Sequence, residues 1–426
     1  MPAFQPVRGM RDLLPEDAAL LNYIVCKARE TACLFGYEEV VTPVVESYEL
    51  LSAKSGEEIR SRMFVFKDLG NRTVALRPEF TASIARLATT TLRNEPKPLR
   101  LFSVGSVYRY DEPQRGRYRE FWQSNFELVG SARPEADAEV ILLTDSLLRA
   151  VGLQSYAFKL GNVGVLRAIL SQEGVDEKTQ NMILQLMDKK EYDEAFKLVK
   201  PEKCRALLSE LLELKAPDAS STVEKMREKV KGYTEAEAAA YNLAEVLRLV
   251  TEGGCNVQTV EPTFARGLEY YTGMIFEVYV PQLEIALGGG GRYDRLIEVF
   301  GGEPTPAVGV AHGIDRIALA LQMQEKTVEP KHVKKAMVIP VNEQVKSEAL
   351  KLAMQLRSAG VPTEFEVMRR RVAKALEDAD RRRIDYAVII GEKELRAKTV
   401  TLRDMAKRLQ ETVPIQALAE KIMHEA

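Results

Sequence analysis

A basic and aromatic stretch between Leu101 and Gly130 is the part of the sequence best suited to bind a charged ligand. Two runs rich in Val, Phe and Tyr flank a polar segment, residues 111–119, that contains proline and glycine. This pattern predicts a long hairpin. A guanidinium group forks onto phosphate oxygens, so arginines in such a loop could bind a polyphosphate, and a solvated turn is the alternative. The arginines in or beside the loop are Arg109, Arg115, Arg117 and Arg119.

Two later segments also suggest a binding site. The four consecutive glycines at 288–291 would let a ligand approach the main chain closely, although a flexible loop is the usual explanation for such a run. The run does not have the strand–GxGxxG–helix form of a dinucleotide fold, and the sequence contains no GxxxxGK[ST]. Arg316 is the one cation in the apolar stretch 306–321, which predicts a short strand followed by a buried helix. A buried arginine needs a carboxylate partner or a bound anion, and both possibilities stay open.

Other residue types narrow the chemistry. The chain has only three histidines, His312, His332 and His424, which argues against a histidine base or a histidine metal cluster. Its four cysteines show no CxxC spacing, so they predict neither a zinc site nor a disulfide framework. Glu79 lies at the start of a predicted helix, where a carboxylate favours the helix dipole, and on this evidence capping is preferred over a ligand role.

The whole chain sets the frame for these residues. With 426 residues it should form two or three domains, and its apolar and charged fractions of 46% and 29% are those of a soluble globular protein. The net charge of −2 means that any nucleic acid would have to meet a local basic patch. The N-terminus has no apolar core of a secretory signal, and no apolar run approaches the ~20 residues that cross a bilayer. We therefore expect a cytoplasmic protein without a membrane partner.

The apolar pattern predicts the elements that position the candidate residues. In the first part of the chain these are helices over 17–35, 81–92 and 134–151, strands over 37–46, 64–67, 73–76 and 256–280, and a small all-helical insertion over about 161–249.

The C-terminal part follows a charged linker at 324–331 and has a different rhythm. Strands are predicted over 336–341, 363–367, 386–390 and 400–402, and helices over 344–359, 372–383 and 415–424. This alternation predicts a partly parallel sheet covered by helices. Residues 369–407 hold twelve Lys or Arg against seven Asp or Glu, which suits nucleic-acid contact or a solvated basic face.

Several separate segments resemble histidyl-tRNA synthetases, in the same order, across essentially the whole chain. Thr42-Pro43 is similar to motif 1 of the class II synthetases, the hairpin to motif 2, and the segment 309–316 to motif 3. The segments 266–271 (RGLEYY) and 290–294 (GGRYD) resemble the two histidine-specific signatures of this family, which are far more specific. The tail resembles the family's anticodon-binding domain.

The resemblance implies an α+β fold: a class II antiparallel sheet flanked by helices, with the helical insertion at 161–249 and a C-terminal α/β domain. It implies a catalytic domain over 1–325, an anticodon-binding domain over 332–426, and a homodimer formed through motif 1. It also implies the joining of histidine to its tRNA by way of a histidyl-adenylate, with ATP as substrate, Mg²⁺ as cofactor and no metal site built from the protein alone.

The resemblance further assigns residues. Arg109 and Arg266 are expected to be catalytic at the α-phosphate. The residues expected to bind ATP are Arg109, Arg117, Phe121 and Arg316. The residues expected to bind histidine are Glu79, Thr81, Gln123, Glu127, Arg266, Tyr270 and Tyr271.

Three positions depart from the family pattern. Asp111 stands where Glu is usual, Glu269 where Asp is usual in RGLDYY, and His312 where an apolar residue is more common. The alternative function is that of the synthetase-like regulatory subunit of ATP phosphoribosyltransferase, a binding protein that lacks the tail and often loses the phosphate-binding arginines. Here the tail, Arg109, Arg266 and Arg316 are present. A synthetase for another amino acid, such as threonine or proline, is a further alternative that the signature at 266–271 disfavours.

Overall fold

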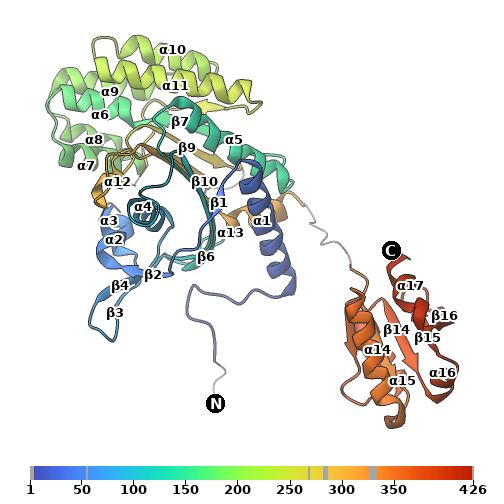
Figure 1. Ribbon diagram of the computed structural model, residues 1–426. Coiled ribbons are helices and arrows are strands. Elements are labelled where there is room, and N and C mark those ends of the chain that lie inside the picture. Colours follow the sequence, from blue (N-terminus) through green and yellow to red (C-terminus); the bar gives the residue numbers. More distant parts are fainter. Residues whose placement is uncertain (1–3, 54–55, 267–268, 282–285, 326–332, 425–426) are drawn as a thin grey trace. The chain divides into compact units, whose positions relative to one another are not determined.

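The computed structural model describes residues 4–53, 56–266, 269–281, 286–325 and 333–424. The chain divides into two compact units, 1–328 and 329–426. An eight-stranded sheet organises the first unit (Figure 1). Its strands, in spatial order, are β1 (Glu38–Glu39), β5 (Leu99–Tyr108), β6 (Glu120–Val129), β11 (Ala307–Gly313), β10 (Ala286–Arg292), β9 (Met274–Tyr279), β7 (Ala157–Asn162) and β8 (Thr259–Val260). Only the outermost pairs, β1 with β5 and β7 with β8, are parallel, so the predicted antiparallel sheet is confirmed.

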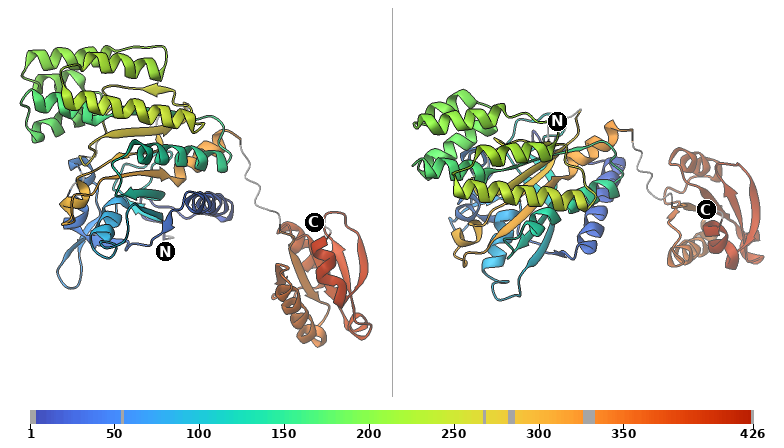
Figure 2. Two further views of the ribbon diagram at one scale, coloured as in Figure 1. Left: turned by 45° about the horizontal axis from the view of Figure 1, so that its top comes forward. Right: turned by 90° about the horizontal axis from the view of Figure 1, so that it is seen from above.

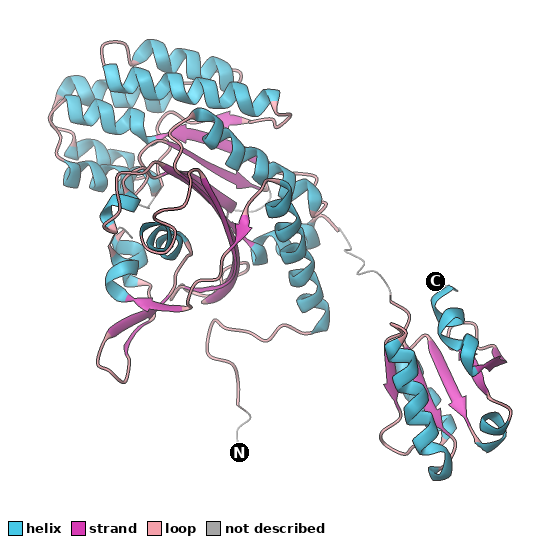
Figure 3. Cartoon of the chain, viewed as in Figure 1, coloured by secondary structure: helices cyan, strands magenta, loops and turns pink. Residues whose placement is uncertain are grey.

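Helices cover both faces of this curved sheet. On one face α1 (Pro15–Leu34), α5 (Pro134–Ala150) and α13 (Ile314–Met323) bury the main apolar core, to which the sheet contributes Phe102 and Phe126. Within the opposite, concave face lies α4 (Thr81–Thr89), as Figures 1 and 3 show. Beside α4 are α2 (Tyr48–Ser52), α3 (Glu57–Ser61), α12 (Leu296–Val299) and a small sheet of β2 (Val45–Ser47), β4 (Thr73–Leu76) and β3 (Val65–Lys67).

The segment predicted as helical over 161–249 forms helices from residue 163 to 252. They gather as one layer along the β7–β8 edge of the sheet (Figure 2). They are α6 (Val163–Gln172), α7 (Glu177–Asp188), α8 (Tyr192–Leu198), α9 (Glu202–Glu213), α10 (Ala219–Lys229) and α11 (Thr234–Glu252). Strand structure predicted over 256–280 is limited to β8 and β9, and the chain between them is irregular where it is described.

The prediction of a single strand over 37–46 is wrong. β1 pairs with β5 in the large sheet, whereas β2 pairs with β4 in the small one, so the chain changes sheets between them. Pro43, which has no N–H to give to a ladder, lies in that crossing. Arg77 holds the crossing in place, because its Nη1 donates to the Thr42 carbonyl at 2.8 Å and its main-chain N–H to the Val44 carbonyl at 2.9 Å.

The glycine run is a strand, not a flexible loop. Gly288 to Gly291 form the middle of β10, between β9 and β11. Main chains approach closely here, since a Cβ on Gly290 would lie 2.1 Å from the Gly309 carbonyl oxygen of β11. The absence of side chains therefore permits this strand pairing.

The second unit is a five-stranded sheet between helices. Its order is β13 (Thr363–Phe365), β12 (Ala336–Pro340), β14 (Tyr386–Ile390), β15 (Thr399–Asp404) and β16 (Gln410–Pro414). The first three strands are parallel and the last two pair antiparallel, so the predicted partly parallel sheet is confirmed. Two apolar clusters lie on opposite faces, one under α14 (Lys346–Ser358) and α17 (Leu418–His424), the other under α15 (Val372–Arg381).

Several elements of this unit were missed or shifted. The prediction missed β16 and α16 (Glu392–Arg396), because their exposed polar residues carry little apolar signal. Short 3₁₀ turns precede α14 and α17: η1 (Glu343–Val345) and η2 (Ile415–Ala417). Most of the predicted linker at 324–331 lies outside the described residues.

We predict that Gly290→Ala lowers the free energy of unfolding by about 1–3 kcal/mol, because the new methyl forces β10 and β11 apart. Gly70→Ala is the matched control, since the nearest atom to its Cβ would be a side-chain oxygen of Asp68 at 3.3 Å. Urea unfolding of both variants measures the difference. Equal midpoints for the two variants would show that strand contact does not demand glycine at 290.

Candidate active site

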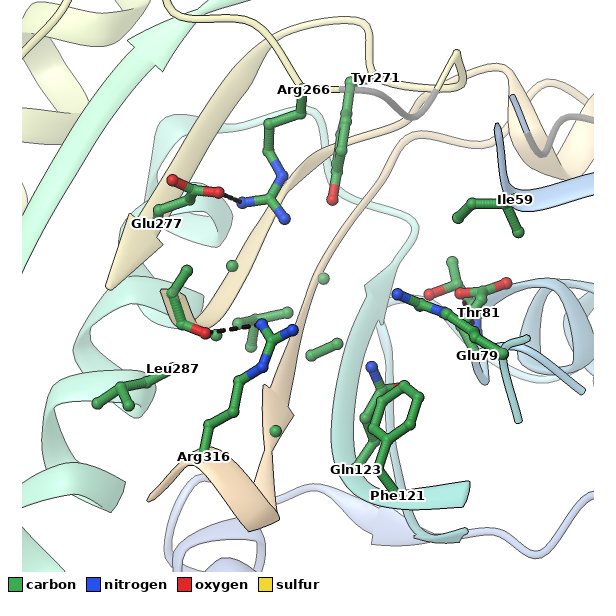
Figure 4. A pocket seen from close by; sticks show the side chains of 18 of the residues that line it. Ile59, Glu79, Thr81, Phe121, Gln123, Arg266, Tyr271, Glu277, Leu287 and Arg316 are labelled. Atoms are coloured by element: carbon green, nitrogen blue, oxygen red, sulfur yellow. Dashed lines mark hydrogen bonds and ion pairs between the residues drawn. The ribbon is translucent and has the colours of Figure 1, made fainter. Parts of the chain in front are cut away.

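One cleft on the concave face of the large sheet gathers side chains from distant parts of the sequence (Figure 4). Its volume is about 280 Å³. Every residue that the resemblance singled out lines it: Glu79, Thr81, Arg109, Arg117, Phe121, Gln123, Glu127, Arg266, Tyr270, Tyr271 and Arg316.

Sheet register explains why these residues meet. Alternate residues of a strand point to one face, so Phe121, Gln123 and Glu127 of β6 all face the cleft. In the register of the sheet Glu127 lies opposite Gly309 of β11, and a Cβ on Gly309 would lie only 1.6 Å from a Glu127 carboxylate oxygen. In the next row Gly289 of β10 lies beneath Arg266. Glycines in the two central strands thus make the floor on which the long polar side chains lie.

Three arginines reach the cleft from three separate segments. Arg109 follows β5 and donates through Nε to the Pro78 carbonyl at 2.9 Å. Arg316 begins on the first turn of α13 and donates through Nη1 to the Ala286 carbonyl at 2.8 Å. Arg266 lies in the irregular segment before β9 and forms an ion pair with Glu277 at 2.7 Å. Figure 4 shows the guanidinium groups of Arg266 and Arg316 extending into the cleft from opposite sides.

The charge of this cluster favours an anion. Burial, together with the nearby positive charges of Arg109, Arg117 and Arg266, lowers the pKa of Arg316 to about 10. Burial also lowers the pKa of Arg109. The Arg117 Nε is buried without a hydrogen-bond partner. Like charges that disfavour one another in a low-dielectric site are stabilised by a ligand of opposite charge, so this end of the cleft is suited to a polyphosphate.

The other two hairpin arginines do not reach the cleft, which corrects the broader hypothesis for the loop. Arg115 is exposed. Arg119 is buried, donates to the main-chain carbonyls of Asp111 and Arg8, and stacks on Tyr110 with 3.6 Å between its Cζ and the ring centroid. Arg119 therefore holds the loop in shape.

Glu127 is the centre of the other end of the cleft. It is 1% exposed and accepts hydrogen bonds from Thr81 Oγ1 at 2.7 Å, from Asn125 Nδ2 at 2.6 Å, and from the Tyr293 hydroxyl. Burial raises the pKa of Glu127 to about 8, although these hydrogen bonds oppose the rise. Burial also raises the pKa of Tyr271 to about 12, so its phenol keeps its proton at neutral pH. A carboxyl group and a phenol together suit a small polar ring with nitrogen atoms.

Between the two ends lie groups that accept hydrogen bonds. Glu79 does cap α4, since its carboxylate accepts from the N–H groups of Thr81 at 2.9 Å and Ala82 at 3.0 Å, yet it also lines the cleft. The Gln123 Oε1 is buried without a hydrogen-bond partner. A cationic donor such as an ammonium group would satisfy that oxygen.

The sequence reasoning missed several residues of the cleft. Tyr293 belongs to the GGRYD segment at 290–294, but only the structure shows its hydrogen bond to Glu127. Glu277 carried no motif signal, although its place on β9, three strands from Glu127 on β6, follows once the strand order is known. Asp188 comes from α7 of the helical segment, and Arg62, which also lines the cleft, pairs with Asp111 at 3.0 Å. No sequence pattern pointed to these contacts.

The remaining two departures from the family pattern lie outside the cleft. His312 faces the opposite side of the sheet and is fully buried between Ser124 and Thr144 of α5. Burial lowers its pKa to about 3, so the ring is neutral and belongs to the core. Glu269 accepts a hydrogen bond from Gln185 of α7 at 2.9 Å, which ties the segment before β9 to the helical layer.

An antiparallel sheet with a long hairpin, a strand–helix pair and facing arginines is the arrangement of a class II aminoacyl-tRNA synthetase. Comparisons with known proteins narrow this class. The family model for histidyl-tRNA synthetase matches residues 9–317, and that for the anticodon-binding domain matches residues 335–425. The chain therefore belongs to the histidyl-tRNA synthetase family.

Individual relatives agree over their whole lengths. The histidine–tRNA ligase of Methanocaldococcus jannaschii is 40% identical, with 97% of this chain and 98% of the relative covered. That of Sulfolobus acidocaldarius is 37% identical, with 100% and 99% covered. Among solved structures, apo histidyl-tRNA synthetase of S. aureus is 26% identical, with a TM-score of 0.76 and 99% and 100% covered. A Bacillus halodurans protein described as an ATP phosphoribosyltransferase regulatory subunit/histidyl-tRNA synthetase is 27% identical, with a TM-score of 0.77 and 92% and 99% covered.

We predict that inorganic triphosphate raises the unfolding temperature of the protein, because it neutralises the arginine cluster only in the folded state. In Arg316→Ala this increase should shrink, while the ligand-free midpoint stays within about 2 °C, since removing a cation from beside other cations offsets the lost hydrogen bond. Arg115→Ala, in the same loop but exposed, should keep the full increase. A full increase in Arg316→Ala would contradict the anion-binding role.

Proposed function

We propose that this protein attaches histidine to its cognate tRNA through a histidyl-adenylate formed from ATP. The observation that carries the proposal is the composition of one cleft: half-buried arginines at one end, and Glu127 beside Tyr271 at the other. One end suits a triphosphate and the other an imidazole, and a two-substrate ligation needs both in one space.

At the nucleotide end each residue has a proposed task. Arg109 and Arg266 flank the α-phosphate, Arg117 reaches the outer phosphates from the hairpin loop, and Arg316 holds the γ-phosphate. Phe121 stacks on the adenine, with the guanidinium of Arg109 5.5 Å from the centre of its ring. The Glu277 carboxylate fixes the direction of the Arg266 side chain.

At the amino-acid end, Glu79, Thr81 and the unpaired oxygen of Gln123 receive the histidine ammonium group. Glu127 and Tyr271 contact the two imidazole nitrogens, and Tyr270 packs beside Tyr271 with 4.9 Å between the ring centroids. A site that hydrogen-bonds both nitrogens rejects analogues without them, because its own buried polar groups would then be left unpaired.

The chemistry follows from this placement. The histidine carboxylate, ionised at neutral pH, attacks the α-phosphorus, a new C–O–P bond forms, and pyrophosphate leaves. No protein base is required, which agrees with a cleft whose described lining residues include no histidine. Fixed guanidinium groups neutralise the charge that develops on the phosphate oxygens. In the second step a terminal ribose hydroxyl of the tRNA attacks the carbonyl carbon, and AMP leaves.

Mg²⁺ would enter with ATP. Among the described residues no group of three or more His, Cys, Asp or Glu side chains could hold a metal ion by itself. Mg²⁺ commonly takes one or two carboxylates together with substrate phosphates, and Glu79 and Asp111 lie in the same cleft as the arginines. The ion would add positive charge at the phosphates.

Three further parts of the proposal concern partners and location. The second unit, with its basic segment, binds the anticodon region of the tRNA. Exposed apolar side chains at the crossing between β1 and β2, such as Val41 at 91% exposure, support a homodimer interface there. None of the helices in the described part of the chain is long and apolar enough to span a membrane. A cytoplasmic location remains a prediction from the sequence.

The regulatory-subunit alternative is less well supported. A purely regulatory protein needs neither an anticodon-binding domain, which matches residues 335–425, nor a complete set of phosphate-facing arginines. ATP–pyrophosphate exchange measured with each of the twenty amino acids tests the proposal. Exchange that depends on histidine is expected. Exchange that depends on another amino acid would show that this amino acid, and not histidine, is the substrate. The absence of exchange with all twenty would favour the regulatory role.

We predict that the affinity for histidine peaks between about pH 6.5 and pH 8. In this window the imidazole of free histidine is neutral and Glu127 keeps its proton. The complex therefore holds one titrating proton between the imidazole and the Glu127 carboxyl. At lower pH an imidazolium meets an uncharged carboxyl, and at higher pH a buried carboxylate meets a neutral imidazole. Titration calorimetry across this range measures the profile.

Glu127→Gln is the matched variant for this profile. The amide keeps the shape of the side chain but cannot titrate. The decline above about pH 8 should therefore move to the higher pH at which the histidine ammonium group loses its proton, while the acid limb stays. An affinity that climbs steadily above pH 8 in the unmodified protein would show that Glu127 does not share its proton with the ligand.

We predict that removal of residues 329–426 spares adenylate formation and lowers the kcat/KM of tRNA charging by about 10²-fold. The two units have separate apolar cores, so the first should fold without the second, whereas tRNA loses one of its two binding surfaces. Exchange and charging assays on one preparation compare the two steps. Normal charging by the truncated protein would remove the proposed role of the second unit.

A further inference from the structure

The segment before α1 makes a set of contacts that the proposed reaction does not yet use. Residues 8–11, which we call the N-terminal strap, lie against the loop of the β5–β6 hairpin. The loop supplies Arg117 to the cleft, and α13 supplies Arg316. The strap contacts both of these elements.

The strap binds the loop first through main-chain atoms. The main-chain N–H of Arg119 donates to the Gly9 carbonyl at 2.8 Å, and the Arg119 Nη1 donates to the Arg8 carbonyl at 3.3 Å. Gly9 has a φ of +84°, and a Cβ there would lie 2.7 Å from the Arg119 side chain. The strap therefore fits closely over Arg119, two residues from Arg117.

Arg11 makes the second connection. Its guanidinium stacks on the Tyr118 ring of the loop, with Cζ 3.6 Å from the ring centroid, and forms an ion pair with Asp315 of α13. The Asp315 side chain is only 4% exposed, whereas that of Arg11 is 34% exposed. One side chain thus joins the hairpin loop to the first turn of α13.

Asp315 extends this connection to the sheet. Its second carboxylate oxygen accepts the main-chain N–H of Trp122 at 2.7 Å. Trp122 follows Phe121 on β6, and Arg316 follows Asp315 on α13. Three residues of the nucleotide end are therefore next in sequence to this set of contacts. Arg316 follows Asp315, Phe121 precedes Trp122, and Arg117 precedes Tyr118.

We propose that Arg11 is a positioning residue for the nucleotide: by bridging Tyr118 and Asp315, it sets the distance between the hairpin loop and α13 to which Arg117 and Arg316 belong. This inference rests on the proposed function. Arg11 does not line the cleft, so it acts through the residues it holds. Its loss weakens ATP binding more than histidine binding, because Glu127 lies five residues along β6 from Trp122 and Tyr271 comes from the segment before β9.

The test compares Arg11→Gln with the full-length unmodified protein in ATP–pyrophosphate exchange. The expected result is a rise of roughly tenfold or more in KM for ATP, with KM for histidine unchanged within about twofold. Arg8→Gln is the matched control. It removes the same charge from the same strap, but the Arg8 side chain is 75% exposed and pairs with the exposed Glu112, so the kinetics of this variant should not change.

Two additional readouts separate positioning from general loss of structure. Trypsin should cleave faster after the exposed Arg115 in Arg11→Gln than in Arg8→Gln, and ATP should slow that cleavage. Asp315→Asn should reproduce the rise in KM for ATP, and the double variant with Arg11→Gln should be no worse than the more severe single variant, because the two side chains act as one unit.

An unchanged KM for ATP in Arg11→Gln, or an equal rise in both KM values, overturns the inference. Additive effects in the double variant overturn it as well. If the unmodified protein shows no exchange, the proposed function fails. The rate of trypsin cleavage still reports on the strap in that case, and equal cleavage of the two variants refutes the bridge itself.

Discussion

The arrangement of the cleft depends on the repulsion between half-buried guanidinium groups that the fold holds close to one another. Arg109 and Arg316 direct hydrogen bonds to main-chain carbonyls, and Arg117 leaves its Nε unpaired. Placing like charges together in this way costs free energy in the empty protein and returns it when a polyanion binds. The sheet, α4 and α13 are the rigid supports that keep these groups from moving apart.

The floor of the cleft shows why rigid support and open space come from the same residues. Glycines of β10 and β11 bring two strands so close that a methyl group would overlap the neighbouring main chain or the Glu127 carboxylate. The same absence of side chains leaves room above the sheet for Arg266 and for substrates. A binding cavity in the middle of a sheet therefore requires no break in strand pairing.

Local patterns predicted much of this from the sequence. The hairpin, the helical segment, the strand before Arg316 and the partly parallel second sheet all follow from apolar periodicity and turn residues. The sheet change around Pro43 could not be predicted in this way, because the choice between two sheets depends on partners elsewhere in the chain, such as Arg77. The glycine run was ambiguous for a similar reason, since only the neighbouring strands decide whether it pairs.

The site was predictable only in part. Motif resemblance brought forward residues that the structure places in one cleft, but their partners carried no local signal. Glu277, Tyr293 and Arg11 became visible only when register and burial were known. A structure with histidine and a non-hydrolysable ATP analogue is the most direct measurement. We expect the phosphates among Arg109, Arg266 and Arg316 and the imidazole against Glu127 and Tyr271. A nucleotide bound elsewhere, or an imidazole directed away from Glu127, would contradict this arrangement.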